Sequence, residues 1–386
     1  MKIYQRFLDL KLPPHQSAFL WGARKTGKTT YLKQKFPKSI YYDLLKTDLY
    51  FDLLKRPSLL REQLSAEDSD LLKQPIIIDE VQKIPQLLDE IHWLIENKNL
   101  SFILCGSSAR KIIRNKANLL GGRAWRYNML PLTSVEINEY KILKILNHGL
   151  IPSHYNDENY PKSLKSYVYD YLKQEVFNEG LTRNIPAFSR FFDSLGYSHG
   201  ELINYSNIAR DCGIDSKTVK EYFQILSDTL LGYFLLPYQK KANRQIITAT
   251  PKFYLFDLGV AGILTNRQIT DTKGISYGKA FEHFIFMELH AYKTYLEKNW
   301  DIKFWRTKSH QEVDFILGEA EIAIEVKSSA NIKSRDTKSL RAFSEEHKPR
   351  KQFIICNENK PRIVNDINIT PWNIFLEKLW SDKIIS

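Results

Sequence analysis

The sequence is poor in cysteine, and its three cysteines, Cys105, Cys212 and Cys356, lie far apart. They form no C-x-x-C pair, which excludes a disulfide framework and a zinc site of closely spaced cysteines. Long hydrophobic runs are also missing, since no segment reaches the roughly 18 to 20 uninterrupted apolar residues of a membrane-spanning helix. Residues 1–15 are charged throughout and lack the apolar run of a secretory signal. We therefore expect a soluble, cytoplasmic protein with buried thiols.

The chain has 386 residues, and a prior of about 150 residues per domain predicts two or three cores. Its apolar content of 43% is sufficient for packed interiors. The formal net charge of +12 favours a polyanionic partner, because basic surfaces attract phosphate backbones. A solvated, lysine-rich surface without such a partner accounts for the charge equally well.

A glycine-rich loop follows the first apolar strand. The segment SAFLWGARKTGKTTYLKQKF predicts a strand at 18–21, a loop, and a helix that begins near Lys28. Glycines let the backbone curl so that N–H groups point at phosphate oxygens, and the helix N-terminus adds the positive end of its dipole. We expect Lys28 to reach the β- and γ-phosphates of ATP and Thr29 to hold Mg²⁺. The predicted ATP contacts are Gly22, Ala23, Arg24, Lys25, Thr26, Gly27, Lys28, Thr29 and Thr30.

Two acidic residues follow the next strongly apolar strand. Three isoleucines in QPIIIDEVQKIP indicate a fully buried strand of a parallel sheet, with Asp79 and Glu80 at its C-terminal end. Sheets of α/β proteins bind their ligands at that end. We expect Asp79 to hold magnesium through water and Glu80 to be the base that polarises the attacking water. A helix-capping aspartate beside a solvated glutamate is the alternative.

Two more positions are candidates for the same site. The strand in SFILCGSS places Ser107 and Ser108 at its C-terminal end, where a hydroxyl can sense the γ-phosphate. Arg123 follows on a loop loosened by two glycines, in LLGGRAWRYN. An arginine there can reach the nucleotide of a neighbouring subunit as a finger. An exposed basic loop without that role is the alternative.

Together these motifs resemble the bacterial and archaeal AAA-family ATPases that carry a C-terminal domain of unknown function. The resemblance rests on GARKTGKTT, IIIDEVQKIP, LCGSSAR, LLGGR and PLTSVE, and further along on PKFYLFDLG. Family members usually have Gly-Pro-Arg at the start of the loop, where this chain has Ala23 in the middle position, a change that leaves phosphate contacts unaffected. The resemblance implies a five-stranded AAA+ sheet, Ser107 as sensor, Arg123 as finger, and assembly into homo-oligomeric rings.

The middle of the chain predicts a helix-turn-helix. Apolar residues fall at helical spacing from Tyr205 to Cys212, Gly213 breaks the helix, and Ser216 is expected to cap a second one. With the strands beyond, this is a winged-helix arrangement, which can sit in a DNA major groove with a basic loop on phosphates. The same scaffold also serves for protein packing, and the sequence leaves both alternatives open. The predicted DNA contacts are Lys217, Lys220, Lys240, Lys241 and Arg244.

The last region predicts a hairpin with acidic residues, in HQEVDFILGEAEIAIEVKSS. A turn at Glu319 and Ala320 makes Asp314 and Glu325 cross-strand neighbours, with Cβ atoms about 5 Å apart, and Lys327 lies on the same face. Two close carboxylates attract a divalent cation, and a neighbouring lysine can activate water for phosphodiester cleavage. A surface hairpin held by salt bridges is the alternative.

This hairpin is similar to the core of PD-(D/E)xK nucleases. In that resemblance Asp314, Glu325 and Lys327 match the D…E-x-K positions, and Glu282, on a predicted helix upstream, matches the helical acid. The proline of the signature is absent, since Val313 precedes the aspartate. The resemblance implies a nuclease-like fold, which a chain can keep after losing the activity.

The sequence thus predicts four parts, led by an α/β domain. The expected function is an ATP-binding, ATP-hydrolysing AAA-family ATPase that uses Mg²⁺ and is associated with DNA, with a magnesium-dependent nuclease as a further hypothesis. One alternative is an ATP-gated signalling or scaffold protein whose nuclease-like domain is inactive and that binds no DNA. A small-molecule kinase is another, although no acceptor pocket or lid has a signature. The parts are a P-loop AAA+ parallel-sheet domain at 1–140, a helical connector at 141–195, an α+β winged helix-turn-helix domain at 196–265, and a PD-(D/E)xK-like α/β domain at 266–386.

Overall fold

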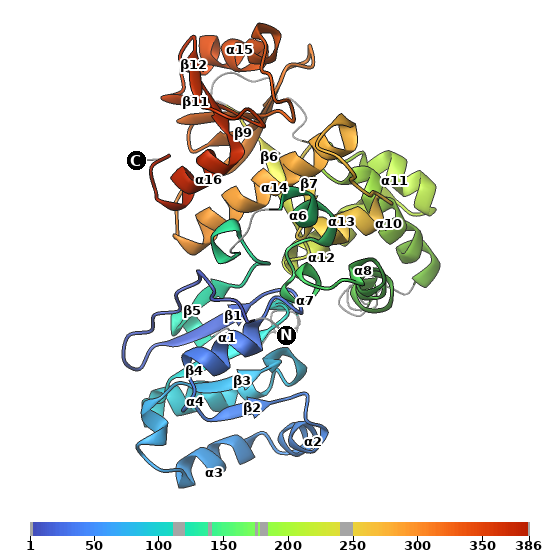
Figure 1. Cartoon of the computed structure of the whole chain (residues 1–386). Helices are drawn as coiled ribbons and strands as arrows, with labels where there is room; N and C mark the ends of the chain where they lie inside the picture. Colours follow the sequence, from blue (N-terminus) through green and yellow to red (C-terminus); the bar gives the residue numbers. More distant parts are fainter. Residues whose placement is uncertain are drawn as a thin grey trace.

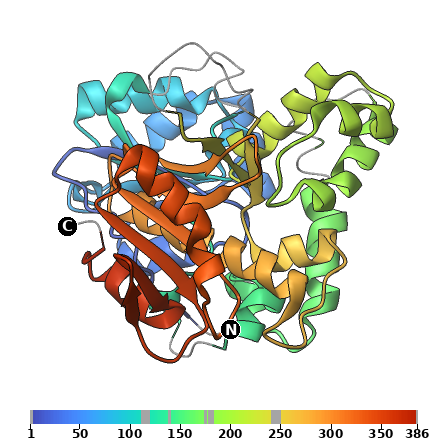
Figure 2. The ribbon, with the colours of Figure 1, turned by 90° about the horizontal axis from the view of Figure 1, so that it is seen from above.

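The computed structural model describes residues 3–110, 120–137, 141–173, 177, 184–239 and 250–384. Two β-sheets lie toward opposite ends of the molecule, and helices from the middle of the chain project to one side (Figure 1). The view from above in Figure 2 shows these helices, in green, beside the C-terminal sheet. The molecule therefore contains two sheet-based units with a helical region between them in the chain.

Five parallel strands form the N-terminal sheet: β1 (Ser17–Trp21), β2 (Tyr41–Asp43), β3 (Ile76–Asp79), β4 (Phe102–Gly106) and β5 (Ala124–Asn128). Their order is β2-β3-β4-β1-β5. Alternate residues face opposite sides, and each side has its own apolar core: Phe19 and Ile78 lie in one, Leu20 and Ile77 in the other. Burial on both faces explains the continuous hydrophobic runs. The predicted parallel α/β sheet is confirmed.

Helices cover both faces of this sheet. The strand-loop-helix order predicted around the glycine-rich loop is present, since β1 ends at Trp21 and the next helix begins at Lys28. The helices of this unit are α1 (Lys28–Lys35), α2 (Thr47–Lys55), α3 (Ser58–Ala66) and α4 (Leu87–Lys98), with short 3-10 turns η1 (Leu71–Lys73), η2 (Val81–Lys83), η3 (Leu120–Gly122) and η4 (Ser134–Glu136).

The described middle of the chain is mainly helical, and it includes the predicted pair of helices. The first member of the pair buries Ile208 and Cys212 and ends at Gly213, whose φ of 66° a residue without a side chain adopts freely. Asp215, not Ser216, caps the second, because the Asp215 carboxylate accepts the N–H groups of Lys217 and Thr218. The elements are α6 (Ile142–His148), α7 (Pro152–Tyr155), α8 (Tyr160–Ser166), η5 (Tyr167–Leu172), α10 (Ile185–Ser198), α11 (Tyr205–Cys212), α12 (Ser216–Asp228) and α13 (Leu258–Leu264).

The second sheet is mixed and has eight strands in the order β12-β13-β11-β10-β9-β8-β6-β7. Parallel pairing of Leu236 with Lys303 and of Pro237 with Phe304 joins β6 to β8. The sheet therefore contains strands from both sides of the domain boundary that the sequence predicts between residues 265 and 266. Its strands are β6 (Gly232–Pro237), β7 (Lys252–Leu255), β8 (Ile302–Arg306), β9 (Glu312–Leu317), β10 (Ile322–Val326), β11 (Lys351–Cys356), β12 (Arg362–Val364) and β13 (Ile367–Pro371).

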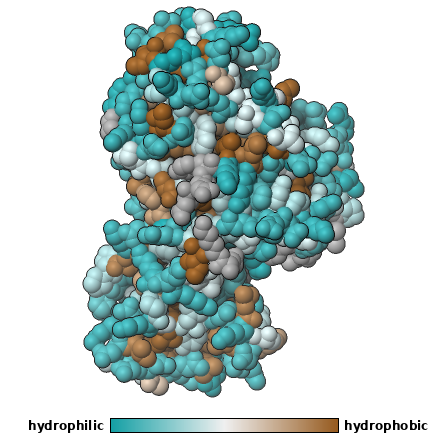
Figure 3. All heavy atoms as spheres, in the orientation of Figure 1, coloured by the Kyte–Doolittle hydropathy of each residue, from teal (hydrophilic) through white to brown (hydrophobic). Residues whose placement is uncertain are grey.

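The longest helix of the described chain, α14 (Gly274–Tyr295), runs between the two sheets (Figure 1). Most of its side chains are buried, which its aromatic-rich sequence requires. The 3-10 turn η6 (Ser334–Thr337) and helices α15 (Lys338–His347) and α16 (Trp372–Trp380) complete the C-terminal unit. The face in Figure 3 is largely hydrophilic with scattered apolar groups. In the described segments, every helix is too short or too polar to span a bilayer.

Candidate functional site

The glycine-rich loop between β1 and α1 is closed around the side chain of Lys28. Gly22 has no room for a side chain, because a Cβ there would lie 2.4 Å from the main-chain oxygen of Met129. Gly27 has a φ of 96° and ends the loop at the first turn of α1. The Lys28 ammonium donates hydrogen bonds to the carbonyl oxygens of Gly22 (2.6 Å) and Ala23 (3.1 Å). The buried ammonium of Lys28 therefore lies inside the loop.

Thr29 and Asp79 are in direct contact. The Thr29 hydroxyl donates to Oδ2 of Asp79 at 2.7 Å, so α1 meets the end of β3. Tyr41, at the start of β2, donates to the same oxygen at 2.5 Å, and burial together with the Asp79 carboxylate raises the Tyr41 pKa. Hydroxyl and carboxylate oxygens are ligands that Mg²⁺ prefers. The sequence predicts Thr29 and Asp79 as a pair, whereas Tyr41 has no sequence signal.

Glu80 follows Asp79 in a left-handed conformation with a φ of 61°. Gln82 donates from Nε2 to Glu80 Oε2 at 2.6 Å and to the Ser107 hydroxyl at 3.1 Å. Arg24 lies 3.7 Å from the same Glu80 oxygen. The structure thus brings together the expected base and the expected sensor through Gln82, a residue that sequence reasoning missed although it stands in the same DEVQK segment.

A cavity of about 630 Å³ opens beside the loop. Its wall includes Arg24, Lys28, Thr29 and Glu80, so several predicted residues share one space. Sequence reasoning missed the rest of the wall, which comes from the N-terminal segment, from α1 and from the start of α7. These additional residues are Ile3, Tyr4, Arg6, Tyr31, Gln34, Pro152 and Ser153. The volume is in the range of small-molecule and cofactor sites.

Residues 14–138 match the family model described as AAA domain. The rest of the chain matches two models that are each described only as a domain of unknown function, DUF8612 over residues 140–271 and DUF4143 over residues 277–375. The glycine-rich loop, Asp79, Glu80 and Ser107 therefore lie within the stretch that matches this model, residues 14–138, here termed the AAA domain.

Two similar proteins are named only as uncharacterized proteins. Uncharacterized protein Rv2008c of Mycobacterium tuberculosis is 22% identical over 249 residues, which are 63% of this chain and 55% of that protein. The chain thus spans about half the length of this relative. Uncharacterized protein MJ1544 of Methanocaldococcus jannaschii is 24% identical over 355 residues, 84% of this chain and 77% of that protein. The solved structure of the Aeropyrum pernix ORC1 protein in complex with DNA covers 66% of this chain and 87% of its own, with 12% identity and a TM-score of 0.28. At that score the similarity carries no argument about this chain.

Arg123 lies at the far end of the AAA domain from the loop. Ala124 pairs with Ser17, so β5 begins level with the start of β1, whereas the loop follows its end. The Arg123 guanidinium pairs with Glu96 of α4, and its main-chain oxygen accepts a hydrogen bond from Gln16. Arg123 is therefore outside the cavity beside the loop.

The acidic residues of the C-terminal unit form a cluster, defined as Glu282, Glu312, Asp314 and Glu325. Leu317 pairs with Ile322 and Phe315 with Ile324, and this register places Asp314 opposite Glu325, as the sequence predicts. Asp314 accepts the N–H of Val326 at 2.7 Å, and Lys327 pairs with Glu325 at 2.5 Å. Burial raises the pKa of Asp314 and raises that of Glu325 to about 7.

The Glu282 carboxylate contacts a tyrosine and a lysine. It accepts the Tyr254 hydroxyl and lies 3.4 Å from the Lys252 ammonium. Within the described residues, no group of three or more His, Cys, Asp or Glu side chains is placed to hold a metal ion. Neither Lys252 nor Tyr254 was predicted, although both stand in the PKFYLFDLG segment that carries part of the family resemblance.

The predicted DNA contacts are only partly described. Lys217 and Lys220 are exposed on α12, and the Lys220 ammonium lies 5.3 Å from the ring centroid of Tyr205. Lys240, Lys241 and Arg244 lie outside the described residues.

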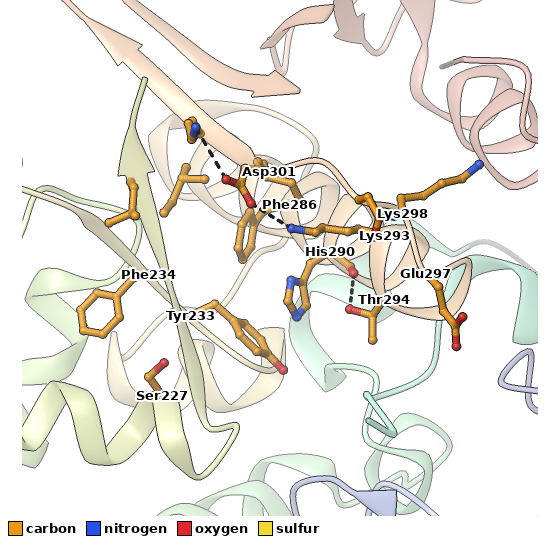
Figure 4. Close-up of a pocket in the computed structure, with 15 residues that line it drawn as sticks. Ser227, Tyr233, Phe234, Phe286, His290, Lys293, Thr294, Glu297, Lys298 and Asp301 are labelled. Atoms are coloured by element: carbon orange, nitrogen blue, oxygen red, sulfur yellow. Dashed lines mark hydrogen bonds and ion pairs between the residues drawn. The ribbon is translucent and has the colours of Figure 1, made fainter. Parts of the chain in front are cut away.

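A second cavity, of about 540 Å³, lies between β6 and α14 (Figure 4). Lys293 and Lys303 both pair with Asp301, and Lys298 pairs with Asp382. Its wall carries three lysines, Lys293, Lys298 and Lys303, and two acidic residues, Glu297 and Asp301.

Proposed function

We propose that the AAA domain binds ATP with Mg²⁺ and hydrolyses it. The observation that carries the proposal is the contact of Thr29 with Asp79 beside the enclosed ammonium of Lys28. The Lys28 ammonium is held only by carbonyl oxygens, which a triphosphate oxygen, with its full negative charge, replaces favourably. The N-terminus of α1, the positive end of its dipole, follows the loop. Because its first turn has no acidic residue, this positive end is free to attract phosphate.

In this proposal each polar residue has one task. Thr29 and Asp79 would hold Mg²⁺, which would supply positive charge beside the phosphate oxygens. Glu80 accepts a proton from the attacking water. Gln82 keeps the Glu80 carboxylate turned toward Ser107, the residue that contacts the γ-phosphate.

Nucleotide titration and phosphate release of the full chain test the proposal. We expect wild-type turnover to need Mg²⁺ and Lys28→Ala to lose nucleotide affinity, because Lys28 is the buried cation of the loop. Lys33→Ala is the matched control, since Lys33 is exposed on the same helix and does not line the cavity. Unchanged affinity and turnover in Lys28→Ala would rule out the site.

We further propose that the chain is associated with DNA through α11 and α12. The net charge of +12 and the exposed Lys217 and Lys220 support this proposal. The alternative is that the same two helices contact another protein, as in a scaffold protein. The two functions differ in the salt dependence of binding, because only phosphate contacts release counterions. If DNA binding of the wild-type chain is absent at low salt, the scaffold function stands.

We also propose a homo-oligomer in which Arg123 contacts the nucleotide of a neighbouring copy, because it lies far from the nucleotide cavity of its own chain. Mixing Arg123→Ala with Lys28→Ala should then restore turnover, since the first supplies an intact cavity and the second an intact arginine. No restoration would remove Arg123 from this role. Nuclease activity of residues 266–386 stays a prediction.

A further inference from the structure

Lys252 of β7 reaches into the acidic cluster from outside the hairpin that carries Asp314 and Glu325. Its side chain is only 5% exposed, and its ammonium pairs with Glu312 and lies 3.4 Å from Glu282. The backbone of β7 is fixed on two sides, since Lys252 pairs with Leu235 of β6 and forms a bridge with Leu202. The lysine is therefore held in place by the fold and is not a mobile surface side chain.

Positive groups and hydrogen-bond donors satisfy most of the acidic cluster. Arg306 pairs with Glu312 at 3.0 Å on the side away from Lys252, and Lys327 pairs with Glu325. The four carboxylates thus face three cations. The raised pKa values of the two most buried carboxyls, Asp314 and Glu325, are consistent with one shared proton as the remaining positive charge.

A divalent cation does not fit this arrangement. Such an ion needs several oxygen ligands around one point, and Glu282 is directed to Lys252 and Tyr254 instead. One buried oxygen, Oε2 of Glu325, has no hydrogen-bond partner within the described residues, but a single free oxygen is not a metal site.

We infer that Lys252 is the resident counter-ion of the acidic cluster, and that its ammonium and a divalent cation exclude one another there. A metal ion beside Lys252 would place two or more positive charges within a few ångströms in a buried region, where Coulomb repulsion is strong. Removal of the lysine would leave four carboxylates facing two cations, Arg306 and Lys327, and would turn the cluster into a cation site. The C-terminal unit, as folded, is consequently not a metal-dependent nuclease, and Lys252 instead ties β7 to α14.

Manganese titration of the full chain, followed by electron paramagnetic resonance without nucleotide, tests this inference. All proteins carry Asp79→Asn, which silences the proposed magnesium site of the AAA domain. We expect the otherwise wild-type cluster to bind no stoichiometric Mn²⁺. Lys252→Met should bind one Mn²⁺ at least about tenfold more tightly, and adding Asp314→Asn should abolish that gain. Lys279→Met is the matched control, because Lys279 also pairs with a glutamate, Glu201, but is 54% exposed.

Two results would overturn the inference. One is stoichiometric Mn²⁺ binding, or metal-dependent cleavage of DNA or RNA, by the chain with Lys252 in place, provided that Asp314→Asn removes it. The other is a folded Lys252→Met protein, judged by circular dichroism, whose Mn²⁺ affinity is unchanged. If Lys252→Met does not fold, Lys252→Gln keeps an N–H donor toward Glu282 without the charge and replaces it in the titration. The Asp79→Asn background separates failure here from failure of the ATPase proposal.

Discussion

Arg6 and Tyr295 are joined by a hydrogen bond of 3.1 Å, although 289 positions separate them in the chain. The same guanidinium donates to the main-chain oxygen of Thr26, inside the phosphate loop, at 2.5 Å and pairs with Glu136 at 3.0 Å. Since Tyr295 is the last residue of α14, one arginine connects the nucleotide loop to the helix that supports the second sheet.

Replacement of Arg6 should destabilise the protein strongly. Arg6→Met leaves the Glu136 carboxylate, whose side chain is 1% exposed, without its cation, and breaking such a buried pair costs about 3–5 kcal/mol. Urea unfolding measures the change. Tyr295→Phe is the matched control and should cost less, about 1–3 kcal/mol, because its hydroxyl accepts hydrogen bonds from Arg6 and from the main-chain N–H of Leu130. Equal stability of Arg6→Met and the wild type would mean that the pair does not contribute.

Glu80→Gln should bind ATP and hydrolyse it slowly. The amide keeps the shape of the carboxylate but accepts no proton from water, and loss of a general base slows a reaction about 10²- to 10⁴-fold. Phosphate release gives the rate and a fluorescent nucleotide the affinity. Wild-type turnover in this variant would show that another group is the base.

Gln82→Ala should lower kcat and leave nucleotide affinity unchanged. Gln82 touches Glu80 and Ser107 but is absent from the cavity wall, so it acts on the base and not on the bound nucleotide. A double-mutant cycle with Glu80→Gln distinguishes this role from a general loss of stability. We expect the double variant to be no slower than Glu80→Gln alone, and additive losses of rate would argue against positioning.

The stability of the chain should fall between about pH 5 and 8 because of Glu288. Burial raises its pKa to about 7, although Ser134 and Trp380 donate hydrogen bonds to it. The folded protein binds the Glu288 proton more tightly than the unfolded chain does, so protonation contributes its full stabilisation at low pH. This contribution is lost as the pH rises through 7. The loss is on the order of 3 kcal/mol at 1.36 kcal/mol per pKa unit.

Glu288→Gln provides the comparison for that pH dependence. Its amide would direct an N–H toward the N–H of Ser134, so we expect lower stability at every pH. Its stability should nevertheless vary less between pH 5 and 8, as measured by denaturant unfolding at several pH values. An unchanged slope would assign the pH dependence to other groups.

Neutralising Lys217 and Lys220 together should weaken DNA binding and reduce its salt slope by about one for each phosphate that the protein no longer neutralises. Fluorescence anisotropy at several salt concentrations measures both quantities. The control is Lys55→Ser with Lys98→Ser, which changes the net charge equally on exposed residues of the AAA domain. If both double variants lose affinity to the same extent, the effect comes from net charge and not from α12.

Sequence patterns predicted the parts of the site that lie within a few residues of one another. The phosphate loop, the end of β3 and the β9–β10 register each follow from local rules: glycine spacing, an isoleucine run before two acids, and a turn of fixed length. The strand in SFILCGSS supplied Ser107 and Ser108 as candidates, and the family resemblance implied Ser107 as the sensor, which the structure places next to Gln82.

Several of the residues that sequence reasoning missed come from distant segments. Arg6 donates hydrogen bonds to Thr26 and Tyr295, and Lys252 pairs with Glu282. No local pattern of apolar and polar residues indicates contacts between such separate segments. Tyr41 was missed because a tyrosine at the start of a short strand looks like an ordinary core residue. The sequence did not predict that β6 belongs to the C-terminal sheet. β6 pairs with β8, which follows it in the chain only after a long helix, and neither strand carries a local signal for this pairing.

The pairing of β6 with β8 also limits how the protein can be divided. A fragment that starts near residue 266 would leave the outer side of β8 with unsatisfied N–H and C=O groups, and exposed strand edges of this kind recruit other chains. A C-terminal fragment prepared for assays should therefore precipitate or self-associate, and soluble fragments should begin before Gly232.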